Sequence, residues 1–410
     1  MFNIEKIRKD FPILEKKING YPLVYFDNAG TTLKPIQVVE AVNDYYLNYC
    51  ANCHSDDFSL GQLAGQRYEE SRTKVAKFIN AESNEIVFTS GDTASLNLVT
   101  YALADLMEAG DEVLLTVAEH ASNTLPWYKI AKDKGIVVNF IQLDKDGRLT
   151  VENVKKAITP KTKVISVAHV TNVLGYIADI KGICEVAHQH GIYVIVDGAQ
   201  SVPHIKTDVK DLDCDFLCFS GHKMCGPTGI GVLYGKYQHL LKLNPPFTGG
   251  GMNGRFDVCG NYTLSLPPAR FEPGTPNIAG AIGLGAAVDY LSAIGMDNIE
   301  KYEKELKDYA VKRLLEEVPN VKIYNLGNEV GIVTFNLKDI FAQDIGTHFN
   351  SYGICVRTGL HCAKTLPELT KSPATVRASL AFYNTFEEVD RFVEVAKKGE
   401  EFLDAFFRWS

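Results

Sequence analysis

Short apolar runs alternate with segments of helical periodicity between residues 85 and 235, and this alternation limits the possible folds more than any other feature. The runs are rich in Val, Ile, Leu and Phe and have the length of buried strands. Repeated strand–helix alternation predicts an α/β fold with a large, mainly parallel sheet sandwiched by helices. The expected strands are Glu85–Thr89, Glu112–Thr116, Val137–Leu143, Lys163–Val170, Tyr193–Asp197, Phe216–Ser220 and Ile230–Tyr234.

Polar side chains follow several of these strands directly. In a mainly parallel sheet the carboxyl ends of the strands meet at one edge, where ligands bind. We therefore expect one site there, built from separate turns. A further turn, Gly91–Ser95, opens a helix whose first N–H groups suit an anion, although the same residues are ordinary helix caps. The residues that follow strands are Glu119, His120, Asn172, Asp197, Gln200, His222 and Lys223.

Lys223 and Asp197 indicate the chemistry of that site. A lysine amine that loses its proton easily forms an imine with a carbonyl, and pyridoxal 5′-phosphate is the commonest carbonyl cofactor of this kind. The cofactor also needs a carboxylate partner for its pyridine nitrogen. Either residue alone is more simply a solvated surface charge. Because each follows its own apolar strand, the pair favours a pyridoxal phosphate site.

The rest of the chain predicts three parts. Residues 1–20 are expected to form an amphipathic helix that packs with the small domain, residues 21–294 the large cofactor-binding domain, and residues 295–410 a smaller α+β domain with a cysteine-bearing loop. Residues 245–277 are rich in Pro and Gly and fit no periodic element, so a long ordered loop is expected. Further helices are expected at Pro35–Tyr49, Ala64–Ile79, Ile278–Ile294, Asp297–Glu317 and Phe386–Phe407.

The composition argues against several classes of partner. The formal net charge is −8, which gives no sign of a nucleic-acid groove or a polybasic membrane patch. No apolar run approaches the roughly 20 residues that a membrane helix needs, and the charged N-terminus lacks the apolar core of a signal peptide. We therefore expect a cytoplasmic protein that binds neither nucleic acid nor membrane.

Nine cysteines are scattered through the chain, several of them inside apolar runs, which favours reduced thiols over a disulfide framework.

Residues Cys50–His54 have the C-x-x-C-H spacing of covalent haem attachment. That chemistry needs export in most lineages, so coincidence is favoured, with a non-catalytic or electron-transfer protein as an alternative. No second Cys/His pair has finger-like spacing, so no metal is expected.

Taken together, the chain resembles the class V aminotransferase family, which are pyridoxal-phosphate-dependent transferases of fold type I. Within it, the chain is most similar to the cysteine desulfurases of the SufS/CsdA type, the second desulfurase group. The resemblance runs from about Leu23 to the C-terminus. Because many stretches match in the same order, they identify the family specifically, whereas a single short motif would not. The matching stretches are Tyr25–Thr32, Phe88–Asn97, Glu119–Trp127, Val194–Gln200, Ser220–Gly231, Phe271–Asn277, Val356–Ala363 and Arg377–Arg391.

The resemblance implies how the cofactor is held. Lys223 corresponds to the lysine that forms the imine and moves protons at the substrate α-carbon, and Asp197 to the partner of the pyridine nitrogen. His120 corresponds to the imidazole stacked on the ring, and Asn172 and Gln200 to amides near its O3′ atom. The phosphate is implied to lie among Thr93, Ser220, His222 and, across a homodimer interface, Thr275 of the partner subunit.

The resemblance also implies the reaction. Cys362 corresponds to a nucleophile whose thiolate attacks the sulfur of L-cysteine, so that alanine leaves and a persulfide remains on the protein. Arg377, which strand alternation faces outward, corresponds to the arginine that clamps the substrate carboxylate. Arg357 is expected nearby, with Asn172 also at the substrate, and Arg357 and His361 are expected to favour the thiolate. The implied destination of the sulfur is iron–sulfur cluster or thiolation pathways, through an acceptor protein of SufE or SufU type.

Three places depart from the family pattern, in which basic side chains are usual. They are Leu360 before the cysteine, Ala121 after His120, and Ser55–Phe58, where two acids are gained. These places line or adjoin the substrate pocket and the transfer surface, so the acceptor and the substrate stay open. A selenocysteine lyase or a cysteine sulfinate desulfinase on the same fold is the alternative. A degenerate scaffold is disfavoured because the central lysine, acid, arginine and cysteine are all present.

Overall fold

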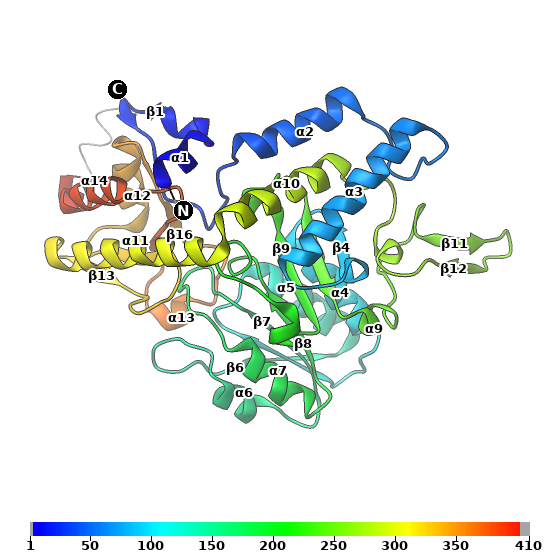
Figure 1. Ribbon diagram of the computed structural model, residues 1–410. Helices are drawn as coiled ribbons and strands as arrows, with labels where there is room; N and C mark the ends of the chain where they lie inside the picture. The colour runs from blue at the N-terminus through cyan, green and yellow to red at the C-terminus, as the bar shows by residue number, and fades with distance from the viewer. Residues whose placement is uncertain (1–2, 402–410) are drawn as a thin grey trace.

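The computed structural model describes residues 3–401 and is built around a seven-stranded sheet of order β4-β10-β9-β8-β7-β5-β6 (Figure 1). Strand β10 (Gly231–Gly235) is antiparallel to both its neighbours, and the other six strands run parallel to one another. The expected large, mainly parallel sheet is confirmed, and no strand end differs by more than two residues from its prediction. The six parallel strands are β4 (Ile86–Thr89), β5 (Glu112–Thr116), β6 (Val137–Ile141), β7 (Thr162–Ala168), β8 (Tyr193–Asp197) and β9 (Phe216–Ser220).

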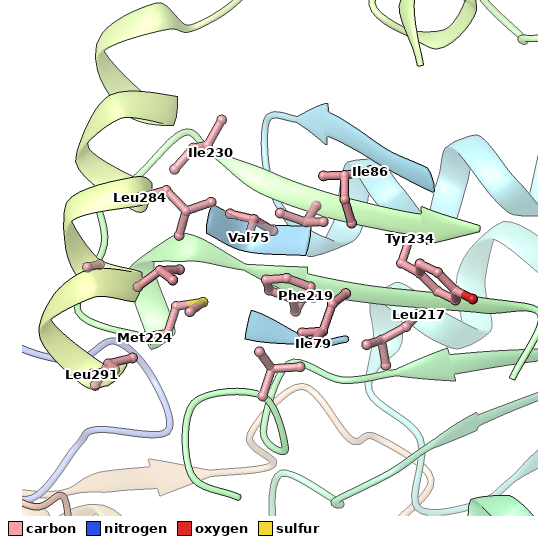
Figure 2. Close-up of a cluster of buried hydrophobic side chains, with 14 of the residues drawn as sticks. Val75, Ile79, Ile86, Leu217, Phe219, Met224, Ile230, Tyr234, Leu284 and Leu291 are labelled. Carbon is pink, nitrogen blue, oxygen red and sulfur yellow. The ribbon is translucent and has the colours of Figure 1, made fainter. Parts of the chain in front are cut away.

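Helices cover both faces of this sheet because its buried side chains alternate between them. Val194 of β8 belongs to one hydrophobic cluster and its neighbour Ile195 to another. Figure 2 shows Val75 of α3 and Leu284 of α10 around Phe219 of β9, on the first face. That face packs against α2 (Ile36–Asn48), α3 (Ser59–Phe78), α7 (Ile180–His188) and α10 (Ile278–Ile294), and the other against α4 (Asp92–Ala104) and α5 (Ala121–Lys134). Shorter helices are α6 (Val151–Ala157), α8 (Val209–Leu212) and α9 (Tyr237–Leu240).

A smaller antiparallel sheet, of order β13-β14-β17-β16, forms the α+β unit that was expected after residue 295. Its core contains the stacked rings of Phe349 and Phe392, with centroids 4.8 Å apart. Val24 and Phe26 also lie in this core, since β3 (Val24–Tyr25) pairs with β15 (Ile354–Cys355). The residue limits of the three parts stay a prediction. The unit comprises β13 (Val321–Ile323), β14 (Ile332–Leu337), β16 (Arg357–Gly359) and β17 (Thr375–Ser379), with α11 (Met296–Glu317), α12 (Ala342–Ser351), α13 (Pro367–Thr370) and α14 (Phe386–Lys397).

Two expected elements are wrong. The N-terminal helix α1 covers only Ile4–Lys9, because Pro12 lacks an N–H and begins a separate 3₁₀ turn before the hairpin of β1 (Lys17–Ile18) and β2 (Tyr21–Pro22). The expected loop at 245–277 contains the hairpin of β11 (Asn253–Phe256) and β12 (Tyr262–Leu264), which extends from the body in Figure 1. Its strands are short and largely exposed, so no apolar alternation marks them. The part of the expected last helix beyond residue 401 lies outside the described residues.

The apolar helix α10 packs against helices α2 and α3 and is mostly buried. No single helix within residues 3–401 is long and apolar enough to cross a membrane. Helices α10 and α11 satisfy that criterion only as a pair, and the pair is bent by 75°.

A buried ion pair joins the proline- and glycine-rich segment to the large sheet. Glu272 accepts hydrogen bonds from both terminal nitrogens of Arg72 on α3, at 2.6 and 2.9 Å. It also accepts from the N–H of Phe88 on β4, at 2.7 Å, and from the hydroxyl of Tyr68, at 2.9 Å. The carboxylate is therefore fully satisfied, and it holds in place the segment that continues to Thr275.

We predict that Glu272→Ala lowers the free energy of unfolding by about 3–5 kcal/mol, because it leaves the buried Arg72 cation with only the exposed Glu69 as an anionic partner. Chemical denaturation of the two proteins measures the difference. Glu70→Ala is the matched control, since its ion pair with Arg67 is exposed and should contribute less than about 1 kcal/mol. Equal losses in the two variants would contradict the prediction.

Candidate active site

The turns that follow five parallel strands bring polar residues together at the carboxyl edge of the large sheet. A narrow cavity lies at this edge. Its walls combine acidic, basic and amide side chains with small apolar ones, the composition of a ligand site. The structure thus brings together five of the predicted site residues and adds one acid. The lining residues are Asp92, His120, Ala168, Val170, Asn172, Asp197, Ala199, Gln200 and Lys223.

Lys223 and Asp197 both face this cavity. Lys223 ends a single 3₁₀ turn, Gly221–Lys223, directly after β9. Asp197 is the last residue of β8, and its Oδ1 accepts a hydrogen bond from the N–H of Ala199 at 3.0 Å. Burial lowers the pKa of Lys223, although the carboxylates of Asp197 and Asp92 oppose the shift. The amine therefore loses its proton more easily than an exposed lysine does.

Two amide oxygens in the cavity wall have no hydrogen-bond partner within the described residues: Oδ1 of Asn172 and Oε1 of Gln200. The amide nitrogen of Asn172 donates to the carbonyl of His361 at 2.7 Å, and that of Gln200 donates to the carbonyl of Ala29 at 2.8 Å. A buried polar atom left unpaired costs about 1–3 kcal/mol. The amides are thus held in orientation while their oxygens remain available to a polar ligand.

His120 and the predicted phosphate residues lie around the first turns of α4 and α5. Nδ1 of His120 accepts from the N–H of Ser122 at 3.1 Å, and burial lowers the pKa of the imidazole. Thr93 Oγ1 is 2.7 Å from Ser122 Oγ, and Ser220 Oγ accepts from the N–H of Asp92 at 2.7 Å. The four side chains therefore lie next to the free N–H groups at the start of α4, which favour anions.

His222 and Thr275 lie apart from the cavity lining. Burial lowers the pKa of His222 to about 4, and its Nδ1 is 3.1 Å from the hydroxyl of Thr31. Thr275 is exposed and accepts a hydrogen bond from Asn52 of its own chain at 3.3 Å. The sequence did not single out Lys34, which donates to the carbonyl of His222 at 2.8 Å and whose pKa burial lowers to about 8.

Arg377 reaches the cavity wall from the smaller sheet. Its side chain is only 1% exposed, and burial lowers its pKa to about 10, so it stays a cation at neutral pH. One terminal nitrogen donates to the carbonyl of Asn172 at 2.9 Å and the other to Asp27 at 3.1 Å. Nε has no partner within the described residues. A buried guanidinium with unused donors suits a carboxylate ligand.

Cys362 is an exposed thiol on a loop that is tied to this site. A terminal nitrogen of Arg357 lies 3.6 Å from its Sγ atom. The carbonyl of Cys362 accepts from the N–H of Ala121 at 2.8 Å, and the carbonyl of His361 accepts from Asn172. Both His361 and Cys362 have positive φ, at 51° and 60°. The loop thus holds the thiol beside a cation and next to residues that border the cavity.

The prediction that His361 adds positive charge beside the thiol is wrong. The imidazole is 3% exposed, and its Nε2 lies 2.9 Å from the hydroxyl of Thr375. Burial, together with Arg377 and Arg357, lowers its pKa to about 3. The ring is therefore neutral at neutral pH, and Arg357 is the cation that contacts Cys362. No sequence signal distinguishes a buried histidine here from a charged one.

The C-x-x-C-H segment does not form a metal site. Cys50 is exposed, while burial raises the pKa of half-buried Cys53 to about 11. Residues 3–401 contain no group of three or more His, Cys, Asp or Glu side chains that is placed to hold a metal ion. The acidic side chains at Asp56 and Asp57 are exposed, in a loop before α3.

Sequence reasoning missed two acids of the site, Asp27 and Asp92. Both lie inside stretches that carry the family resemblance, and each follows a strand end within three residues, which was the available signal. Their burial and their charged neighbours depend on elements far away in the chain. That information is present only in the folded protein.

The sequence model of the aminotransferase class-V family matches residues 24–392. The chain belongs to this family. A protein named probable cysteine desulfurase from Halalkalibacterium halodurans is 48% identical over 410 residues, which cover 99% of this chain and 100% of that protein. Among solved structures, a cysteine desulfurase from Thermococcus onnurineus NA1 is 40% identical, with a TM-score of 0.91 and coverage of 96% and 97% of the two chains.

The cysteine desulfurase CsdA of Escherichia coli is 35% identical, with a TM-score of 0.91 over 98% of this chain and 99% of that one. At this level of similarity both structures have the same overall fold as this chain. The predicted fold class, a pyridoxal-phosphate-dependent transferase of fold type I, is thereby confirmed, as is the resemblance to desulfurases of this type.

We predict that Arg357→Gln slows the alkylation of Cys362 by iodoacetamide at neutral pH by up to about tenfold, because the guanidinium 3.6 Å from Sγ attracts the negative charge of the attacking sulfur. Mass spectrometry of the peptide that contains Cys362 measures the rate separately from the other cysteines. His361→Gln is the control and should leave the rate nearly unchanged, since that ring is neutral. An unchanged rate in Arg357→Gln would rule out the electrostatic effect.

Proposed function

We propose that the protein is a pyridoxal-phosphate-dependent cysteine desulfurase, which converts L-cysteine to L-alanine and keeps the sulfur as a persulfide on Cys362. The observation that carries the proposal is the cation-paired thiol of Cys362, on a loop bonded to the wall of a cavity that contains Lys223 and Asp197. Relatives that are 44–48% identical over nearly the whole chain bear the same activity in their names.

The residues of the cavity fit pyridoxal 5′-phosphate, its cofactor. Asp197 supplies a buried carboxylate, Lys223 an easily deprotonated amine, and Asn172 and Gln200 unpaired oxygens, as the polar edge of such a ring requires. The start of α4 supplies free N–H groups for a phosphate. When bound, the cofactor withdraws electrons from the substrate α-carbon and makes its proton removable.

The chain's own residues then have distinct tasks. Arg377 holds the substrate carboxylate through the donors that its contacts with Asn172 and Asp27 leave free. Lys223 accepts the α-proton, since desolvation favours its neutral amine. The Cys362 thiolate attacks the substrate sulfur, so that a sulfur–sulfur bond forms while the carbon–sulfur bond breaks and its electrons stay with carbon. Protonation of that carbon, together with return of a proton from Lys223 to the α-carbon, completes alanine.

A homodimer is part of the proposal. Thr275, which corresponds to a phosphate contact given by a second subunit, does not line its own chain's cavity. The nearby β11–β12 hairpin exposes Phe256 and Tyr262 beside a hollow of about 480 Å³. Exposed apolar surface of this kind is typical of a protein interface.

Transfer of the sulfur to a second protein agrees with the exposure of Cys362. The acceptor of SufE or SufU type, the iron–sulfur cluster or thiolation pathway, and the cytoplasmic location remain proposals that follow from the family resemblance. Selenocysteine lyase and cysteine sulfinate desulfinase activities are the alternatives, because either reaction could proceed without a nucleophilic cysteine.

We predict that Cys362→Ser retains the violet absorption of the bound cofactor but loses alanine and sulfide formation from L-cysteine by at least about 100-fold, because a hydroxyl is a poor nucleophile toward sulfur. Alanine is measured with cysteine, selenocysteine and cysteine sulfinate as substrates. Cys259→Ser, at an exposed thiol on the hairpin, is the control and should keep full activity. A fully active Cys362→Ser variant on cysteine would refute the proposed mechanism.

We predict that Arg377→Lys raises the KM for L-cysteine by about 10- to 100-fold, because lysine cannot present two parallel donors to a carboxylate. This factor corresponds to the free energy of one hydrogen bond to a charged group. Steady-state alanine production measures KM, and cofactor absorption shows that the site is intact. Arg391→Lys serves as the control, since Arg391 contacts only backbone carbonyls, of Pro22 and Tyr352. A KM within twofold of the wild type would exclude Arg377 as the clamp.

A further inference from the structure

Asp92 is a buried acid that the proposed mechanism leaves without a task. It is the first residue of α4 and is 7% exposed. Its backbone N–H donates to Ser220, but Oδ1 of its carboxyl group has no hydrogen-bond partner within the described residues. The side chain lines the same cavity as Lys223 and Asp197. A buried carboxyl group that is kept without a partner, and that faces a ligand cavity, requires an explanation.

The amine of Lys223 is the basic group that lines the same cavity as Asp92. Within residues 3–401 it makes no hydrogen bond, whereas Asp197 already accepts from Ala199 and, in the proposed function, serves the cofactor's pyridine nitrogen. Burial raises the pKa of Asp92 well above its usual range, and the amine of Lys223 opposes this shift. Each group therefore stabilises the charged form of the other.

We propose that Asp92 is a second acidic partner of Lys223, a positioning residue that stabilises the lysine as an ammonium whenever its amine is not bonded to the cofactor. The inference rests on the proposed function. According to this inference, Asp92 sets the pH range in which Lys223 takes up and releases protons. The step is only a proton transfer from the Asp92 carboxyl group to the Lys223 amine. It leaves an ammonium group beside a carboxylate, so the protonation of one group depends on that of the other.

Other charged groups around the pair come from several elements. Asp197 at the end of β8 raises the pKa of both groups, and both Asp197 and Lys223 act on His120 at the start of α5. Arg357 of β16 and Arg377 of β17 lower the pKa of Lys223. The thiol of Cys218 on β9, whose pKa burial and Asp92 both raise, stays neutral. Both arginines are cations, and Asp197 is a further acid that already accepts from the N–H of Ala199.

The test follows the capture of pyridoxal 5′-phosphate by protein from which the cofactor has been removed, as a function of pH. Only the neutral amine attacks the aldehyde, so the rate, read from the violet absorption, rises through the pKa of Lys223. Asp92→Asn should move this midpoint to lower pH by about one unit, because removal of a nearby carboxylate disfavours the ammonium. Below the midpoint the variant should capture the cofactor about tenfold faster than the wild type.

Asp105→Asn is the matched control, since Asp105 lies at the other end of α4 and pairs with Lys134 on the surface. It should leave the midpoint unchanged. Asp92→Ser provides a second neutral variant and the same expected shift, in case Asp92→Asn does not fold. The titration of the cofactor itself is common to all the proteins and does not affect the comparison.

Two results would overturn the inference. One is a midpoint in the neutral Asp92 variants that equals that of the wild type. The other is a rate that rises equally at every pH, which would mean that Asp92 acts on the cofactor's phosphate rather than on the lysine. A wild-type protein that captures no cofactor at any pH would instead refute the proposed function, so the two failures are distinguishable.

Discussion

The side chain of Arg377 crosses from the smaller sheet to the carboxyl edge of the larger one, and the site depends on this contact. A buried guanidinium is tolerated only where acceptors surround it. One of its acceptors is the carbonyl of Asn172, in the turn after β7, and another is the carboxylate of Asp27. Thr334 of the smaller sheet adds a bond to the carbonyl of Val173, in the same turn. These bonds align the two sheets where the cavity forms.

Charge is balanced around the cavity by opposing pairs. Arg377 faces Asp27, and Lys223 faces two acids, Asp197 and Asp92. Burial lowers the pKa of Lys223 and of Arg377 and raises that of Asp92, while the opposite charges nearby oppose each shift. In such a site the buried groups exchange protons more easily than they would in water. An added ligand with a carboxylate and a phosphate therefore meets cations and free N–H groups already in position.

The neutral ring of His361 illustrates how a motif differs from a site. In the sequence the histidine adjoins Cys362 and is expected to share its surroundings. In the structure, consecutive residues with positive φ turn the two side chains apart, so that the imidazole is buried against Thr375 and the thiol is exposed beside Arg357. Adjacent residues thus have opposite environments, which a linear pattern cannot express.

Local patterns were enough to predict the strands of the large sheet, the helices that cover it and the turns that carry Lys223, Asp197 and Asn172. Each of these depends on a short apolar run and the polar residue that ends it, which the amino-acid order states directly. The short helix before Pro12 and the exposed β11–β12 hairpin were missed, because their limits come from few residues with little apolar alternation.

The order of residues therefore determined the elements, the family and the identity of the reactive groups. Only the tertiary structure decided which acids face the lysine, which cation contacts the thiol and which histidine is neutral. The reason is physical: burial and charge pairing shift a group's protonation state over a few ångströms, and the partners come from β-strands and helices hundreds of residues apart in the chain.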